Sequence, residues 1–86
     1  GVRAQPRLVE AGGGLRPPGG SVLLSCRGSG FQFKSLDVRW YRQEPVGVLE
    51  WVSACWSLGA TNYGASVESG ATASRDNSLS ESFLSL

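Results

Sequence analysis

Histidine is absent from this sequence of 86 residues. It is the usual general base of enzymes and the usual partner of a nucleophilic serine or cysteine, so its absence argues against catalytic activity. The two cysteines alone fall short of a zinc tetrad, and the seven acidic residues lie singly, without the spacing of a calcium loop. We therefore expect no enzyme and no cofactor.

Charge clusters and long apolar runs are missing as well. Eight basic and seven acidic residues leave a net charge of +1, and the basic residues are scattered along the chain. This distribution predicts no nucleic-acid partner. No segment approaches the ~18 consecutive apolar residues that a transmembrane helix requires, so membrane insertion is not expected.

The sequence does contain a pattern of short strands. Val22, Leu24 and Cys26 alternate at period two, which places them on one face of a β-strand. Trp40 follows the cysteine by 14 residues, a spacing that lets it return on a facing sheet and cover the sulfur. Residues 11–21 are rich in glycine and proline and form a connector. The chain is therefore predicted to be all-β, with room for one domain at most.

Several ordered segments carry a family resemblance. They are Leu8-Val9-Glu10, Gly12-Gly13-Gly14-Leu15, Pro18-Gly19-Gly20-Ser21, Gly30-Phe31-Gln32-Phe33, Leu49-Glu50-Trp51-Val52-Ser53 and Ser74-Arg75-Asp76-Asn77-Ser78. With them, the chain resembles an immunoglobulin heavy-chain variable domain over essentially its whole length. The resemblance implies a V-type sandwich at residues 5–86 that lacks the last two strands and the third hypervariable loop. Residues 1–4 resemble the end of a secretion leader, or else a cloning remnant, and the protein is expected to be secreted.

The resemblance also assigns binding residues. The antigen contacts that it implies are Lys34, Ser35, Leu36, Asp37, Trp56, Ser57, Leu58 and Tyr63. The interface that it implies with a light chain consists of Tyr41, Gln43, Leu49 and Trp51. Tyr41 stands where conventional heavy chains carry valine, as in single-domain camelid antibodies. Leu49 and Trp51 are conventional, so a conventional heavy chain is the preferred interpretation.

Other positions depart from the family in ways that weaken a sandwich. Gly28 replaces an inward alanine, and Ser82 replaces an inward leucine. Gly70 replaces the arginine of a structural ion pair, and Ala71 and Ala73 replace large core residues. A lost large core side chain or a lost disulfide costs about 2–5 kcal/mol each, against a total stability of about 5–15 kcal/mol for a typical domain. We therefore expect that a single chain does not keep the sandwich.

Stacking of identical copies is another way to bury the apolar strands. Three segments are nearly uncharged and free of internal proline, as in steric zippers. Their zipper residues are Val22, Leu23, Leu24, Val48, Leu49, Trp51, Val52, Phe83, Leu84 and Leu86. The sequence is thus predicted to form a cross-β amyloid fibril of parallel, in-register strands, with antigen binding lost. The alternative is an antigen-binding variable domain of an antibody or a single-domain binder.

A fibril of stacked copies restricts where charged side chains can lie, because each charge repeats along the fibril axis. The basic residues expected at solvent or beside acids are Arg3, Arg7, Arg16, Lys34 and Arg75, with Glu10, Asp37 and Asp76 among those acids. The residues expected to be buried are Leu23, Leu24, Trp51 and Phe83.

The two cysteines raise a separate question. Cys26 resembles the first half of the family's inter-sheet disulfide, whose second half this sequence does not contain. Cys55 is an additional cysteine, and 28 residues separate the two. Closing that loop would stabilise the chain by about 3–4 kcal/mol in the chain-entropy model. A non-native disulfide between Cys26 and Cys55 is therefore predicted, with free thiols or cross-linked dimers as the alternatives.

Overall fold

The computed structural model describes residues 5–43, 45, 47–65, 67 and 70–86, and in this part the only helix is one short 3-10 turn, η1 (Phe33–Ser35). The strands are β1 (Arg7–Gly12), β2 (Leu23–Ser29), β3 (Val38–Gln43), β4 (Leu49–Cys55), β5 (Thr61–Tyr63), β6 (Thr72–Asp76) and β7 (Glu81–Ser85). Residues 1–4, where the leader-like remnant was expected, lie outside the described part. The all-β class is confirmed.

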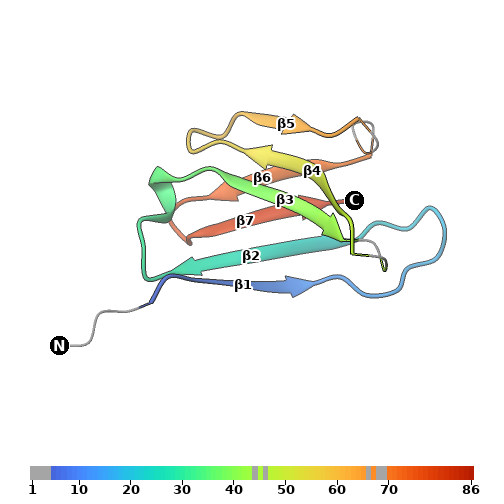
Figure 1. Ribbon diagram of the computed structural model, residues 1–86, viewed down its shortest axis with the longest axis horizontal. Coiled ribbons are helices and arrows are strands. Elements are labelled where there is room, and N and C mark those ends of the chain that lie inside the picture. The colour runs from blue at the N-terminus through green and yellow to red at the C-terminus, as the bar shows by residue number, and fades with distance from the viewer. Residues whose placement is uncertain (1–4, 44, 46, 66, 68–69) are drawn as a thin grey trace.

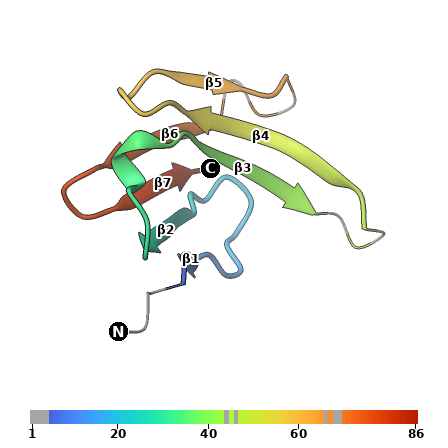
Figure 2. The same cartoon turned by 60° about the vertical axis from the view of Figure 1, so that its left-hand side comes forward.

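The strands form two antiparallel sheets that face each other. One has the order β1-β2-β7-β6, and the other has the order β3-β4-β5 (Figure 1). Turning the molecule shows the three-stranded sheet lying as a second layer over the four-stranded one (Figure 2). This arrangement is compatible with a β-sandwich. The structure describes one chain as two packed sheets, whereas the expectations that a single chain does not keep this arrangement and that copies stack stay predictions.

Strand β2 shows how the period-two pattern builds the core. Cys26 is buried, and Leu24 two residues before it is half-buried. Val22 continues the strand pairing just outside β2, because its backbone exchanges hydrogen bonds of 3.0 and 2.9 Å with Leu86. Leu23 points the other way and is 58 % exposed, which is what alternation requires. The one-face prediction for these residues is confirmed.

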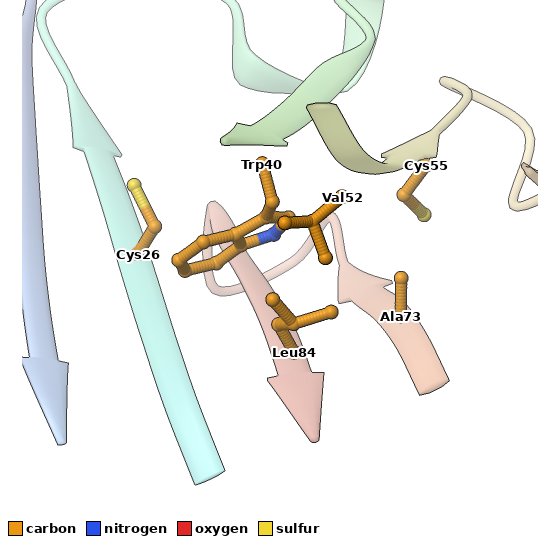
Figure 3. Packing of buried hydrophobic residues seen from close by; sticks show 6 residues of the cluster. All are labelled: Cys26, Trp40, Val52, Cys55, Ala73 and Leu84. Carbon is orange, nitrogen blue, oxygen red and sulfur yellow. The ribbon is translucent and has the colours of Figure 1, made fainter. Parts of the chain in front are cut away.

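The core lies between the two sheets around one tryptophan. Its buried members are Cys26, Trp40, Val52, Cys55, Ala73 and Leu84 (Figure 3). The indole of Trp40, from β3, lies beside the Cys26 side chain of β2 and above Leu84 of β7. The sequence therefore predicted correctly that a tryptophan from a facing sheet covers this cysteine. Ala73, a small residue at a core position, lies at the edge of the cluster.

A β-bulge in β4 places two adjacent side chains on the buried face of the sheet. Trp40 pairs with Ser53 and Tyr41 pairs with Trp51, so Val52 has no opposite residue on β3. Because of this extra residue, Val52 and Ser53 are both buried although they are adjacent in the chain. Trp51, on the other side of the bulge, points outward.

Two substitutions that were expected to empty the core are accommodated. A Cβ at Gly28 would lie 2.7 Å from Cζ of Phe31 and 2.8 Å from Cδ2 of Phe33, so aromatic rings fill the space beside this glycine. The inner face is therefore filled at this point, although a glycine replaces the alanine that the resemblance implies. Ser82 faces inward as predicted and is fully buried, where its hydroxyl has hydrogen-bond partners in Trp40 and Ser74.

Four zipper residues expected to be buried in a fibril are not fully buried in the single chain, and their burial in a fibril stays a prediction. Leu23 is 58 % exposed and Trp51 is 37 % exposed, because both lie on outward faces of the sandwich. Leu24 and Phe83 are half-buried rather than buried. Burial of all four side chains would require something to cover the outer faces of both sheets.

The charged residues follow the expectation with one exception. Arg7, Arg16 and Lys34 are exposed, and Arg3 lies outside the described residues. Arg75 is half-buried, and its guanidinium donates to neutral oxygens rather than lying beside an acid. Asp76 accepts hydrogen bonds from the hydroxyl and the backbone of Ser78, and the hydroxyl is the main cause that lowers the pKa of this carboxyl.

Candidate functional site

All of the predicted antigen-contact residues except Tyr63, which lies on β5 against the core, gather at one end of the sandwich. Residues 34–37 follow β2 and include part of η1, whereas residues 56–58 connect β4 to β5, and both segments lie at the same end in Figure 1. They are joined directly, because the backbone N–H of Ser57 donates a 2.9 Å hydrogen bond to Oδ1 of Asp37. Two segments that are 20 residues apart in sequence thus form one surface.

Arg75 fixes this surface from beneath. Its guanidinium donates to the carbonyl of Phe33 at 2.9 Å and to the carbonyl of Cys55 at 3.1 Å, which tethers both segments to β6. The guanidinium carbon also lies 4.7 Å from the centre of the Phe33 ring, within cation–π distance. Asn77 accepts a further bond from Arg75 at 2.7 Å and donates to the carbonyl of Ser57 at 3.2 Å. The guanidinium therefore supports both segments at once.

The contact side chains differ in how far they protrude. The exposed ones are Lys34, Ser35, Leu36, Asp37 and Leu58, and the half-buried ones are Trp56, Ser57 and Tyr63. Leu58 is 99 % exposed at the tip of a tight turn. Trp56 closes this turn at both ends, since its N–H donates to Ala60 and its carbonyl accepts from Gly59, each at 2.8 Å. Gly59 has φ +100°, which glycine adopts without strain.

The four residues that resemble a light-chain interface form a second surface. On the outer face of β3 and β4, Tyr41 lies opposite Trp51, and Gln43 lies opposite Leu49. All four are exposed, with Leu49 at 64 % and Tyr41 at 51 %. Neighbouring Val48 is also exposed, at 61 %. The sheet therefore presents a largely apolar outer face.

A hollow of about 350 Å³ connects the two surfaces. It lies on the outer face of the β3-β4-β5 sheet, and we call it the aromatic hollow. Ala54 is part of its lining, together with Arg39, Tyr41, Trp51, Trp56, Asn62 and Tyr63. Trp56 and Tyr63 belong to the predicted antigen contacts, and Tyr41 and Trp51 to the predicted light-chain contacts. The structure thus brings members of both sets together.

A groove of about 260 Å³ opens along the free edge of β3. Among the strands of the described part, this one pairs with β4 on one side only, and β1 is likewise the end strand of its sheet. The side chains along the groove include Leu8 and Glu10 from β1 and Val38 and Trp40 from β3, with Cys26 between the sheets. The core is therefore accessible from this side of the sandwich.

The two cysteines are not bonded to each other in the structure. Both thiols are free and buried, and Trp40 and Val52 lie between them in the core (Figure 3). The predicted Cys26–Cys55 disulfide is therefore absent from this fold, because β2 and β4 hold the two side chains at opposite ends of the cluster. Burial raises the pKa of both thiols, and at Cys55 the positive charge of Arg75 partly opposes this effect.

No group of three histidine, cysteine, aspartate or glutamate side chains among the described residues could hold a metal ion. Ser53 Oγ is buried without a hydrogen-bond partner, but it lies in the core rather than in a pocket that contains a base. In the same part of the chain, no helix could span a bilayer.

The residues that organise the site were not all found from the sequence. Arg39, Asn62 and Asn77 were not assigned a role, and Arg75 was expected at solvent. Arg75 follows buried Ala73 at period two, so alternation along β6 could have placed it toward the inside. Comparison with known protein families finds no family model that matches the chain.

Proposed function

We propose that this chain is an immunoglobulin heavy-chain variable-type domain, and that it acts by recognition rather than by catalysis. The observation that carries the proposal is the strand order. An immunoglobulin domain of the constant type has seven strands, and its first, second, fifth and fourth strands lie side by side in one sheet. Variable domains add two strands to the other sheet, directly after the third strand in the chain. The orders β1-β2-β7-β6 and β3-β4-β5 agree with that arrangement. Trp40 on β3, packed against Cys26 on β2, agrees with it as well.

The recognition surface in this proposal is the end of the sandwich built by residues 34–37 and 56–58. Support comes from the bond between Ser57 and Asp37 and from the tethers that Arg75 makes to both segments. Such an end is where variable domains carry two of their antigen-binding loops. Exposed Leu58 and half-buried Trp56 supply the apolar contact area that antibody-type loops use. The outer face with Tyr41 and Trp51 would receive a light chain, and the protein would be secreted.

A display experiment tests this proposal without knowledge of the antigen. One library randomises the exposed or protruding positions Lys34, Ser35, Leu36, Ser57 and Leu58, while Asp37 and Arg75 are kept. A matched library randomises residues 14–16, 19 and 20 of the connector at the other end of the sandwich. Both are displayed on yeast and selected against the same set of unrelated folded proteins.

The expected result is that saturable, target-specific binders arise from the loop library and that the connector library yields none. Equal yields from both libraries, or no binders from the loop library while its members remain displayed and protease-resistant, would contradict the proposal. In antibody-type surfaces, a few loop residues contribute most of the binding free energy. Five randomised positions are therefore sufficient to yield binders with micromolar dissociation constants.

A second candidate function is a fibril of stacked copies, with antigen binding lost. It is favoured by the free edge of β3 and by the exposed apolar side chains of Leu23, Leu49 and Trp51. A free strand edge is a template for pairing with another chain. Ser53 adds to this, because an unpartnered buried hydroxyl weakens the sandwich by about 1–3 kcal/mol.

Fibre diffraction distinguishes the two candidates. A cross-β fibril gives a meridional reflection at about 4.7–4.8 Å together with thioflavin binding. A chain that stays monomeric after weeks at 37 °C, with a native near-UV circular dichroism spectrum, excludes the fibril as its resting form. Parallel, in-register stacking requires in addition that spin labels at Leu23 of neighbouring copies lie about 4.8 Å apart.

A further inference from the structure

We propose that the aromatic hollow binds a planar aromatic anion, such as an aryl carboxylate. This inference rests on the proposed recognition function, because it assigns a class of ligand to part of the same surface. Its physical basis is the lining of the hollow, which combines the aromatic side chains of Tyr41, Trp51 and Trp56 with one cation. Aromatic walls and a few convergent polar groups are typical of small-molecule sites.

The wall formed by Trp56 is held in place before any ligand arrives. Its indole Nε1–H donates to Oδ1 of Asn62 across the turn, and its backbone closes the turn through Ala60 and Gly59. The guanidinium carbon of Arg39 lies 5.8 Å from the centre of the Trp56 ring. A side chain that is already ordered loses little conformational freedom on binding, so it provides a stacking surface at low entropic cost.

The second wall is formed by Tyr41 and Trp51, which lie opposite each other in the ladder of β3 and β4. Tyr63 borders the hollow at the edge of β5, but its hydroxyl accepts a 2.8 Å hydrogen bond from the backbone N–H of Ala73 on the facing sheet, so its ring packs against the core and is not a stacking wall. Ala54 is small and 2 % exposed, so no large side chain from β4 fills the space between these rings.

Arg39 determines the charge of the ligand. Of the described residues that line the hollow, it is the only charged one, and it is exposed. A guanidinium offers a planar fork of donors that matches a carboxylate, and it also stacks on aromatic rings. An anionic group on an aromatic ring could therefore bind Arg39 while the ring stacks between the aromatic walls.

The size of the hollow limits the ligand to one or two rings. About 350 Å³ is near the lower end of ligand pockets, which span about 300–1,000 Å³. A fused bicyclic acid such as 2-naphthoate has the required shape and charge. A protein loop would be too large to enter, although an aromatic side chain near a chain's carboxyl terminus presents the same chemistry.

The test uses the whole chain with 2-naphthoate as the probe, followed by two-dimensional NMR of the tryptophan indole N–H groups. Neutral 2-naphthamide keeps the rings without the charge, and cyclohexanecarboxylate keeps the charge without the planar ring. We expect saturable shifts of the Trp56 and Trp51 indole signals with 2-naphthoate. Each of the other two probes is expected to bind at least fivefold more weakly.

Two variants separate the hollow from general surface binding. Arg39→Gln should raise the dissociation constant for 2-naphthoate about 5- to 20-fold, which is less than a buried charge-assisted hydrogen bond contributes because Arg39 is exposed, and should leave that for 2-naphthamide unchanged. Arg42→Gln, an exposed arginine on the same strand outside the hollow, is the matched control and should leave both constants within twofold.

Absence of saturable indole shifts with 2-naphthoate, or equal loss of affinity in Arg39→Gln and Arg42→Gln, overturns the inference. Equal binding of 2-naphthoate and 2-naphthamide does so without any variant. The loop library leaves every lining residue of the hollow unchanged, so the two proposals fail separately. Binders from the library without naphthoate binding overturn only the ligand class, and the reverse outcome overturns only the recognition function.

Discussion

The indole Nε1–H of Trp40 donates a 3.2 Å hydrogen bond to the hydroxyl of Ser82 across the core of the sandwich. That hydroxyl donates in turn to the carbonyl of Ser74 on β6 at 3.2 Å. Ser82 is completely buried, so its hydroxyl and the indole N–H satisfy each other where water cannot. A serine at a position where the resemblance implies leucine is thus a polar connection between the sheets, in place of apolar packing.

Replacing that serine should therefore destabilise the domain. Ser82→Ala leaves the indole N–H of Trp40 buried without an acceptor, and we expect a loss of about 1–3 kcal/mol in the free energy of unfolding measured in urea. Ser74→Ala is the matched control, because its side chain is exposed and should change stability by no more than about 0.5 kcal/mol. Equal losses in both variants would contradict a role for the hydroxyl.

Arg75→Lys should loosen both loop segments together. Lysine keeps the charge but cannot reach the carbonyls of Phe33 and Cys55 at once, and hydrogen bonds from charged donors contribute about 1.5–3 kcal/mol. We expect a loss in this range and faster hydrogen exchange at the N–H of Ser57, which bonds to Asp37. Arg7→Lys on exposed β1 is the control. Unchanged exchange at Ser57 in Arg75→Lys would show that this arginine does not organise the surface.

The aromatic rings beside Gly28 make this position intolerant of a side chain. Gly28→Ala places a Cβ within 2.8 Å of two ring atoms, so we expect it to lower the free energy of unfolding by about 1–3 kcal/mol. Gly70→Ala meets no atom of the described residues within 4 Å and is the matched control. If Gly28→Ala stabilises the protein instead, the rings of Phe31 and Phe33 do not occupy this space in solution.

Stability should fall at alkaline pH through the two buried thiols. The ordinary pKa of a cysteine thiol is about 8.5, and burial raises the pKa of Cys26 and Cys55 in the folded chain. Their contribution is complete below the unfolded value and is lost as pH rises toward the folded values, because only the unfolded thiols ionise there. The expected slope is at most about 1.4 kcal/mol per pH unit for each thiol.

Urea titrations between pH 7 and pH 10 measure this dependence. The double variant Cys26→Ala, Cys55→Ala removes both thiols and should show a shallower decline than the unaltered chain under reducing conditions. An identical decline in the two proteins would assign the alkaline loss to other groups. A steeper decline in the variant would reverse the sign that burial requires.

Single lysines on the exposed apolar faces should slow any fibril growth. Leu49→Lys and Leu23→Lys place a charge on residues that are 64 % and 58 % exposed, so stability should change by no more than about 0.5 kcal/mol. Each should lengthen the thioflavin lag time several-fold, because stacked copies would repeat the charge. Leu15→Lys, at a fully exposed leucine of the connector, is the control and should not lengthen the lag.

The local patterns in the sequence were sufficient to predict the fold class and the centre of the core. Alternation around Cys26 and the spacing to Trp40 depend only on neighbouring residues and on the geometry of two facing sheets. The core substitutions were harder to judge. The space beside Gly28 is filled by Phe31 and Phe33, which follow in the next loop, and no strand pattern predicts where their rings turn.

The binding surfaces were predicted residue by residue but not as an arrangement. The resemblance named Trp56 and Tyr41 in separate sets, whereas the structure places both in one hollow. Arg39 and Arg75 were missed because their roles arise from contacts between strands that are distant in sequence. The expected disulfide is absent for the same reason, since β2 and β4 belong to different sheets and hold at opposite ends of the core two thiols that an unfolded chain could join.

The bulge at Val52 lets β4 lose one residue there without changing the face of the sheet on which the other side chains lie. Deleting Val52 would leave Trp51 opposite Tyr41 and Ser53 opposite Trp40, so each residue would keep the face of the sheet that it has now. Deleting any residue of β4 other than Val52 or Ser53, the two residues of the bulge, would turn part of the strand over and exchange its buried and exposed side chains. During evolution, a change in the length of this strand could therefore be absorbed at Val52 with the loss of one core side chain, while the outer face stayed intact.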